Sequence, residues 1–161
     1  MKTKKFNGFN EEGCLPLGIY EMTLEEFEDI FSKNKSLRRR EIMKHYKKHV
    51  EEIINSPYYL NHWINGSYVT LKENPKDIDT LTEFDGVEID KHDDKTKIED
   101  LIYNAPLRTE NTCHSFLVYK YPESFPNEYE KYLEIKSRTL AILFAKNKVT
   151  KNPKGYIKLK N

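Results

Sequence analysis

The sequence predicts a single α+β domain in which helices and short strands share one core. Stretches with apolar residues three and four apart, typical of helices, alternate with short runs of branched and aromatic residues, typical of strands. The chain has 161 residues, of which 37% are hydrophobic, and this suffices for one domain with a core of its own. We therefore assign residues 1–161 to one domain.

The N-terminal third predicts an arm followed by two helices. Residues 1–20 contain Gly and Pro where they interrupt any regular element, so we expect an irregular arm docked on the body. Thr23 with Glu26 three residues later is the pattern of a capping box, which predicts a helix start. A second helix is expected from Ser36 to about Asn55, with its early basic residues off the buried stripe. The side chains expected to face inward are Leu24, Phe27, Ile30, Phe31, Met43, Tyr46, Val50 and Ile53.

The rest of the chain predicts strands separated by turns and helices. The expected strands are residues 58–64, a strand that carries Asp77 and Asp79, residues 112–121 and an edge strand at residues 156–159. The expected helices are a short one at residues 68–72, one at residues 95–103 and a long one at residues 128–146 capped by Asn127, with Tyr129, Leu133, Leu140 and Phe144 inward. Residues 84–94 read as an acidic loop with a brief strand at residues 87–90.

Two carboxylates follow a Gly66-Ser67 corner at a distance of nine residues. Asp77 and Asp79 are separated by one apolar residue, so on a strand both point to the same face. Neighbouring carboxylates repel each other unless a cation lies between them, and oxygen ligands of this kind suit Mg²⁺ with phosphates. Gly66 allows a close approach of the backbone to a ligand, and Ser67 offers a hydroxyl to a phosphate.

This arrangement resembles the signature of the nucleotidyltransferase superfamily of the DNA polymerase β type. Wider stretches resemble small bacterial and phage nucleotidyltransferase-like proteins of unknown function. Those stretches are Phe9-Asn10, Gly13 to Tyr20, Asn65 to Thr70, Pro75 to Asp79, Phe116 to Pro122 and Pro153 to Ile157. The resemblance implies the minimal nucleotidyltransferase fold, in which a small mixed sheet carries the acids and helices pack mainly on one face. It also implies that Asp77 and Asp79 hold Mg²⁺ and that Gly66, Ser67 and Lys72 bind the nucleotide.

The third carboxylate of that superfamily has no counterpart at the expected place. It completes the metal site and acts as the general base, yet no Asp or Glu occurs between Glu110 and Glu123. His114 stands about where the acid is expected, and an imidazole can accept a proton or bind a softer metal than Mg²⁺. A decayed site and an ordinary strand histidine are the alternatives. Glu88 or Asp90 replaces the acid if the strands are ordered differently.

The resemblance implies transfer of a nucleotidyl group from an NTP to a hydroxyl of a protein or an RNA. Small stand-alone relatives often belong to toxin–antitoxin or phage-defence modules, which implies a partner protein from the same phage or host system. The missing acid supports a second hypothesis, a catalytically degenerate fold that binds a protein or a nucleotide as an antitoxin or inhibitor. A third is nucleic-acid binding through the basic helix, against which the near-neutral net charge of +1 counts.

Charge and composition limit the remaining possibilities. Residues 35–48 and the basic C-terminal tail, residues 147–161, flank ten acids at residues 77–100; they are solvated faces or they steer a polyphosphate toward the acids. The two cysteines are too few for a disulfide framework, and no run of 18 apolar residues appears, so we expect a cytoplasmic protein outside the membrane. His45 and His49 have a metal-binding spacing but lack an intervening Glu. Lys136 and Arg138 are candidates for phosphate contact, although solvent exposure is the favoured expectation.

Overall fold

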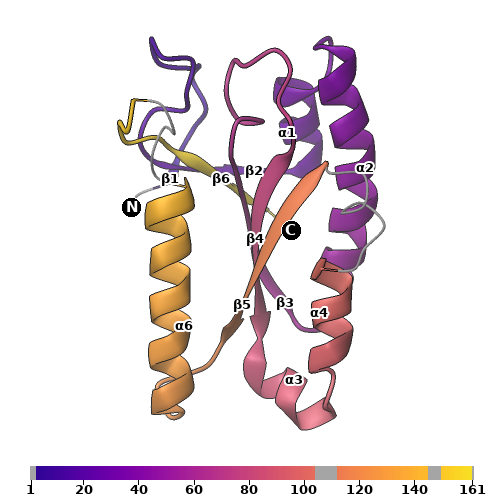
Figure 1. Cartoon of the computed structure of the whole chain (residues 1–161), viewed down its shortest axis with the longest axis vertical. Coiled ribbons are helices and arrows are strands. Elements are labelled where there is room, and N and C mark those ends of the chain that lie inside the picture. Colours follow the sequence, from indigo (N-terminus) through magenta and orange to yellow (C-terminus); the bar gives the residue numbers. More distant parts are fainter. Residues whose placement is uncertain (1–2, 104–111, 145–149, 161) are drawn as a thin grey trace.

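The computed structural model describes residues 3–103, 112–144 and 150–160, and it shows an α+β fold built on one mixed sheet of six strands (Figure 1). The strands are β1 (Thr3–Lys4), β2 (Ile19–Met22), β3 (Tyr59–Asn65), β4 (Ile78–Asp85), β5 (Cys113–Lys120) and β6 (Tyr156–Leu159). The helices are α1 (Leu24–Phe31), α2 (Leu37–Ile54), α3 (Gly86–His92), α4 (Lys95–Tyr103) and α6 (Pro126–Arg138), which continues into a π-helix, η1 (Thr139–Phe144). The predicted fold class is confirmed.

The sheet has the strand order β1-β2-β6-β3-β4-β5. β3 runs antiparallel to both of its neighbours, β6 and β4, whereas β5 is parallel to β4 and β2 is parallel to β6. The prediction of an edge strand at residues 156–159 is therefore wrong, because β6 lies between β2 and β3. The reason is that its partners, residues 19–22 and 59–65, are far away in the sequence, and the local sequence carries no sign of that pairing.

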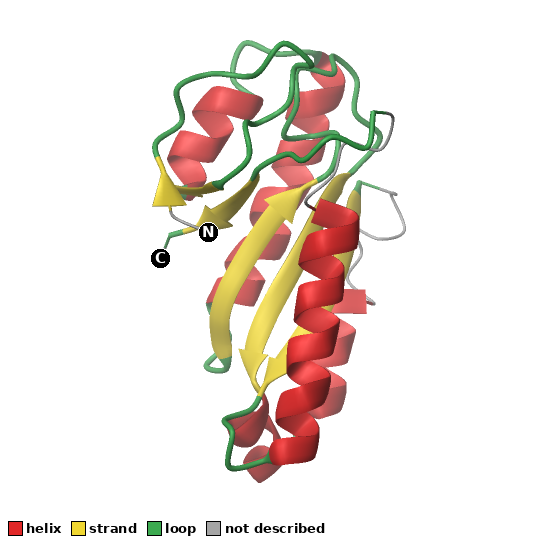
Figure 2. Ribbon diagram, turned by 90° about the vertical axis from the view of Figure 1, so that its left-hand side faces the viewer, coloured by secondary structure: helices red, strands yellow, loops and turns green. Residues whose placement is uncertain are grey.

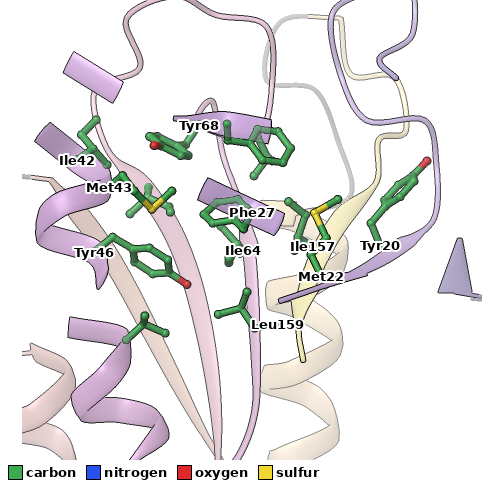
Figure 3. Packing of buried hydrophobic residues seen from close by; sticks show 14 of the residues in the cluster. Tyr20, Met22, Phe27, Ile42, Met43, Tyr46, Ile64, Tyr68, Ile157 and Leu159 are labelled. Atoms are coloured by element: carbon green, nitrogen blue, oxygen red, sulfur yellow. The ribbon is translucent and has the colours of Figure 1, made fainter. Parts of the chain in front are cut away.

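The helices cover the two faces of the sheet unequally. α1 and α2 pack on one face, where their apolar side chains meet Ile64, Ile78 and Ile157 in the largest hydrophobic cluster (Figure 3). α4 extends the same layer, since Ile98 and Ile102 share a cluster with Ile53 of α2. Of the described helices, only α6 with its continuation η1 lies against the other face, as the two views show (Figures 1 and 2). The expectation that helices pack mainly on one face fits this arrangement.

The helix starts that the sequence signalled by side-chain caps are present. Thr23 and Glu26 form the reciprocal capping box of α1, and Ser36 accepts a hydrogen bond from Arg39 N at the start of α2. The arm at residues 1–20 docks as expected, with Phe6 and Phe9 packed against the main cluster. The arm is not wholly irregular, however, because β1 and the first residues of β2 join the sheet. Among the described residues, no helix combines the length and the apolarity needed to cross a membrane.

Two predictions after β4 are wrong. Residues 86–92 form α3 instead of a loop with a brief strand, because Asp85 Oδ1 accepts a hydrogen bond from Glu88 N and caps a helix. α6 begins at Pro126 without a side-chain cap instead of at a cap by Asn127. Tyr132 is buried and Tyr129 and Leu140 pack against the same cluster, the last two as predicted, whereas Leu133 is 44% exposed. The α-helix gives way to a π-helix at Thr139, which shifts the phase of the side chains. The side chain of Phe144 and residues 145–149 lie outside the described part.

Candidate functional site

The sheet brings three of the predicted site residues together at one end. Gly66 follows the last residue of β3, Asp79 is the second residue of β4, and His114 is the second residue of β5. Asp79 pairs across the ladder with Asn65 on one side and with His114 on the other. This end of the sheet is uppermost in Figure 1. The strand register therefore places Gly66, Asp79 and His114 at one end of the sheet.

The Asp79 carboxylate lies directly against the backbone of Gly66. Asp79 is 8% exposed, and a Cβ atom built on Gly66 would lie 1.8 Å from Asp79 Oδ2. Gly66 has a φ of +81°, a backbone conformation that side chains other than glycine rarely adopt. Its amide donates a hydrogen bond of 2.7 Å to Asn65 Oδ1, which fixes the corner. Glycine at this position is therefore required by conformation and by space at once.

The two oxygens of the Asp79 carboxylate have different surroundings. Oδ1 lies 3.2 Å from Nδ1 of His114, whose side chain is half exposed and packs on the Phe116 ring at a centroid distance of 4.6 Å. Oδ2 is buried and has no hydrogen-bond partner among the described residues. A buried carboxylate oxygen without a partner is costly, so this atom is the clearest candidate in the site for a bound cation or donor.

Asp77 precedes β4 by one residue and is half buried. The guanidinium of Arg38 donates a hydrogen bond of 2.5 Å to Lys76 O, which ties this part of the loop to α2. The charges of Asp77 and Asp79 affect the pKa of Cys113, the first residue of β5. Burial raises the pKa of the Cys113 thiol to about 11, and the nearby charges of Asp79 and Asp77 favour the same direction. The thiol is thus protonated at neutral pH and is no candidate nucleophile.

Residues 68–69 form a turn and Thr70 an isolated bridge to Cys14, so the short helix predicted to begin at Ser67 is absent. The reason is a buried arginine of α2. The Arg39 guanidinium donates hydrogen bonds to Tyr68 O at 2.8 Å, Thr70 O at 2.6 Å and Lys72 O at 2.7 Å. Carbonyls that a helix would use internally are bound to this side chain instead. The corner therefore presents no helix N-terminus to a phosphate, and Lys72 is exposed while Ser67 is half buried.

Arg39 was missed as a structural residue because sequence reasoning placed it on the solvent face of α2. It is 3% exposed, and it also donates to Phe31 O at 2.9 Å and stacks over the Tyr68 ring at 5.0 Å. Tyr68 in turn donates its hydroxyl to Arg39 O at 2.8 Å. In the sequence, Arg39 is one of three consecutive arginines, and nothing local shows that it is the buried one. Arg39 holds the loop that links Gly66 to Asp77.

Lys154 is the second residue that sequence reasoning missed. It belongs to the basic C-terminal segment, yet it is 5% exposed and its Nζ donates a hydrogen bond of 3.2 Å to Gly66 O. The next residue, Gly155, is packed so closely that a Cβ there would lie 2.4 Å from Pro16 O. Nothing in the local sequence distinguishes Lys154 from the other lysines of this segment. A positive charge thus lies behind the Gly66 corner.

A family model matches this chain over residues 7–160, and it describes a family of unknown function, DUF6932. The chain is a member of DUF6932. No curated protein and no solved structure matched the chain. The matched range includes most of the arm, the Gly66 corner, both carboxylates and β6, so in this DUF6932 protein the described site lies within the family's own domain.

Several other candidate residues lie away from the DUF6932 site. Glu88 and Asp90 belong to α3, at the opposite end of β4 and about 20 Å along the strand from Asp79 (Figure 1). Asp90 accepts a hydrogen bond of 2.8 Å from the Tyr121 hydroxyl, and Glu88 pairs with Lys91. Neither carboxylate can complete the site. The prediction that one of them replaces the third acid is wrong for this arrangement of strands.

The basic segments separate on the two faces of the sheet. Asp79 points to the same face of the sheet as Leu81 and Glu83, which is the face that α6 covers, whereas α2 packs on the opposite face. Of residues 35–48, Arg38 reaches Lys76 O beside Asp77, while Lys154 of the C-terminal segment reaches Gly66 O at the corner. Lys136 of α6 was expected to be exposed to solvent, but most of its side chain is buried. It forms a 2.8 Å ion pair with Glu83 and stacks over the Trp63 ring at 4.9 Å.

The described side chains provide no preformed metal centre. Within residues 3–103, 112–144 and 150–160, no three or more His, Cys, Asp or Glu side chains are grouped so that they hold a metal ion. His49, one of the two spaced histidines, is buried with Nε2 3.4 Å from Ser115 Oγ. The donors that do fit a metal are two carboxylates, one with an unpartnered buried oxygen. Such a set suits a hard cation that takes its other ligands from water and phosphates.

Proposed function

We propose that this DUF6932 protein is a nucleotidyltransferase-like protein that binds a nucleoside triphosphate with Mg²⁺ at Asp77 and Asp79. One observation carries the proposal: Asp79 Oδ2 is buried without a partner and is pressed against the Gly66 backbone. Asp79 and Gly66, which the sequence analysis assigned to one site, lie in contact in the structure. Mg²⁺ bound there with the nucleotide would withdraw charge from the phosphates.

The chain's own groups have distinct roles in this proposal. Asp77 and Asp79 hold the cation, with Asp79 Oδ2 as the oxygen available to it. Gly66 and Ser67 contact the phosphates through the backbone and the hydroxyl, and Lys154 adds a positive charge behind the corner. With Nδ1–H of His114 donated to Asp79 Oδ1, Nε2 is left to take the proton of an acceptor hydroxyl. The oxygen of the acceptor hydroxyl then bonds to the α-phosphorus of the nucleotide, while the bond between the α-phosphorus and the departing pyrophosphate breaks.

The first test is thermal melting with and without NTP and MgCl₂. A ligand that binds only the folded protein at about 100 times its Kd adds roughly 2.7 kcal/mol, or about 5–10 °C for a chain of this size. We expect this rise in the native protein and its loss in Asp79→Asn. Glu130→Gln on the exposed surface of α6 is the matched control and should retain the full rise. An unchanged melting temperature with all four NTPs would contradict nucleotide binding.

The second test measures transfer. The protein is incubated with α-labelled NTPs, Mg²⁺ and a cell lysate, and label on protein or RNA is measured after gel separation. Label that appears with the native protein and disappears with Asp77→Ala supports transfer at this site. Label that survives the substitution rejects it. The identity of the labelled species decides whether the acceptor is protein or RNA, and isolation of that species tests the proposed setting of phage defence or toxin–antitoxin pairing.

A second candidate function is binding without catalysis. The observation that favours it is the contact of His114 with Asp79, where a third carboxylate would otherwise stand. General-base catalysis contributes roughly 10²–10⁴-fold, so replacement of a carboxylate that is also a metal ligand would slow transfer strongly. A nucleotide-dependent rise in melting temperature without any transfer of label identifies this binding function. His114→Asp, which restores the carboxylate, should then gain transfer of label.

A further inference from the structure

A polar groove lies between α1 and α2, on the helical layer opposite the face that carries Asp79. Its volume is about 790 Å³. All of its lining residues are charged or polar: Glu28, Asp29, Ser32, Lys33, Asn34, Arg40, Lys44, Lys47, Lys48 and Glu51. Protein interfaces depend on an apolar or aromatic centre, and this groove offers none. Its chemistry therefore suits a partner that is recognised through charge and hydrogen bonds.

The acids of α1 in this groove are already neutralised. Glu28 forms an ion pair of 2.6 Å with Lys47, and Asp29 forms one of 3.0 Å with Lys33. Each of these two carboxylates thus has a cation of its own, and Glu51 is the other acid of the lining. The remaining basic residues are in excess over it, so the groove has a net positive charge.

Those remaining cations form a row along α2. Arg40, Lys44 and Lys48 are exposed and spaced by four residues, so they lie on one face of the helix, one turn apart. None of the three takes part in an ion pair within the described ranges of the chain. The row extends over about 12 Å, given a rise of 1.5 Å per residue. A linear array of unpaired cations matches a linear polyanion better than a compact one.

We propose that this groove binds the phosphodiester backbone of a single-stranded polynucleotide, with Arg40, Lys44 and Lys48 on successive phosphates. Backbone phosphates are bound by Lys, Arg, Ser and Asn side chains, which are the types that line the groove. The described lining residues include no aromatic side chain that could stack on bases, so binding is independent of sequence. The surface is separate from Asp77 and Asp79, and this inference does not rest on the nucleotidyltransferase proposal.

Fluorescence anisotropy with labelled 12-nucleotide RNA and DNA of mixed sequence tests the inference. We expect binding at 50 mM salt that weakens as salt rises, with a slope of log Kd against log salt of about 2, because three phosphate contacts contribute roughly 0.7 each. The variant Lys44→Glu/Lys48→Glu should weaken binding at least about tenfold. Lys131→Glu/Arg138→Glu, which reverses two exposed charges on α6, should bind like the native protein.

The remaining outcomes separate this inference from the proposed function. Asp79→Asn should bind the oligonucleotides with native affinity, even if it abolishes the effect of NTP on melting. RNA and DNA should bind alike, since the contacts are to phosphate. Absence of binding at 50 mM salt, affinity that salt does not change, or equal affinities of the two charge-reversal variants would each overturn the groove as a polynucleotide site.

Discussion

The Cα atom of Gly66 lies against the side chain of Asp79, so closely that an added methyl group would fall 1.8 Å from Asp79 Oδ2. The corner and the carboxylate come from neighbouring antiparallel strands, and the register places Asp79 opposite Asn65, the residue before the glycine. The contact is thus a consequence of strand pairing. It links the conformation of the corner to the position of the acid, so a change in one must change the other.

Gly66→Ala should destabilise the protein and abolish its response to nucleotide. The substitution places a Cβ at a φ of +81°, which costs about 1–2 kcal/mol, and the clash with Asp79 adds about 1–3 kcal/mol. We expect the free energy of unfolding in urea to fall by about 2–4 kcal/mol. The melting temperature should no longer rise with NTP and Mg²⁺, because the displaced carboxylate loses its alignment.

Gly8→Ala is the matched control for this prediction. Gly8 has a φ of +112°, yet an added Cβ there would meet nothing within 4 Å. It should therefore lose only the conformational part, about 1–2 kcal/mol, and should keep the response to nucleotide. Equal losses of stability in the two variants, or a native nucleotide response in Gly66→Ala, would show that the contact with Asp79 has no functional importance.

Arg39→Met should be among the most damaging single substitutions on α2. Its guanidinium is bound to four backbone carbonyls, and buried acceptors that lose their donor cost about 1–3 kcal/mol each. We expect a loss of about 3–5 kcal/mol in the free energy of unfolding. Arg39→Lys should recover little of it, because one ammonium cannot replace the planar fork. Arg40→Met, at the exposed neighbouring position, should change stability by less than about 0.5 kcal/mol.

The same arginine shows where prediction from sequence stopped. Periodicity placed the buried stripe of α2 correctly at Met43, Tyr46 and Val50, because apolar residues at helical spacing indicate the buried face. Periodicity placed Arg39 in solvent, because nothing in the local sequence shows that carbonyls distant in the chain accept its hydrogen bonds. The helix expected at residues 68–72 is absent for a related reason. The carbonyls that it would use accept hydrogen bonds from Arg39 of α2, a contact that the sequence of these residues does not show.

Strands and site residues were predictable to the extent that their signals were local. β3 and β5 were predicted from branched and aromatic runs and β4 from its alternating acids, and the register of the three strands then placed Asp79 beside both Gly66 and His114. The central position of β6 and the burial of Lys154 depend on contacts with segments far away in the chain, and no local pattern encodes them. The candidate acids were thus found from sequence, whereas the lysine behind the corner required coordinates.

Stability should fall as the pH decreases from about 6.5, because two histidines are buried in the neutral form. Burial lowers the pKa of His49 to about 4 and that of His62 to about 3, where the nearby His49 adds to the effect. An unfolded chain has histidines with a pKa near 6.5, so below that pH the unfolded state binds more protons than the folded state. The expected loss is about 1.4 kcal/mol per pH unit for each histidine. Above pH 7 neither histidine contributes a pH dependence.

Urea unfolding at intervals between pH 5 and pH 8 measures this slope. The window lies above the titration of the carboxylates, so the histidines dominate it. In His49→Gln/His62→Gln, stability should be nearly independent of pH between 5 and 7, even if the variant is less stable at pH 8. His92→Gln, on the surface helix α3, is the control and should retain the native slope. A native protein whose stability does not change between pH 7 and pH 5 would contradict the prediction.

The ion pair of Glu83 with Lys136 should couple α6 to the sheet. Glu83 is buried, and burial alone would raise its pKa, but hydrogen bonds from Lys136, Tyr132 and Asn61 hold the pKa below its usual value. Lys136→Met leaves a buried charge with fewer donors and should cost about 3–5 kcal/mol. Glu83→Gln/Lys136→Met removes both charges and should recover part of that loss.

A double-mutant cycle in urea measures the coupling, which we expect to be about 1–3 kcal/mol. Lys131→Met is the control, because Lys131 is exposed on the same helix and should lose less than about 0.5 kcal/mol. The comparison separates the pair from helix propensity, since both lysines are replaced by the same residue. A coupling near zero would mean that α6 is held by apolar packing of Tyr132 on Trp63, Leu81 and Val118 and not by the buried charge.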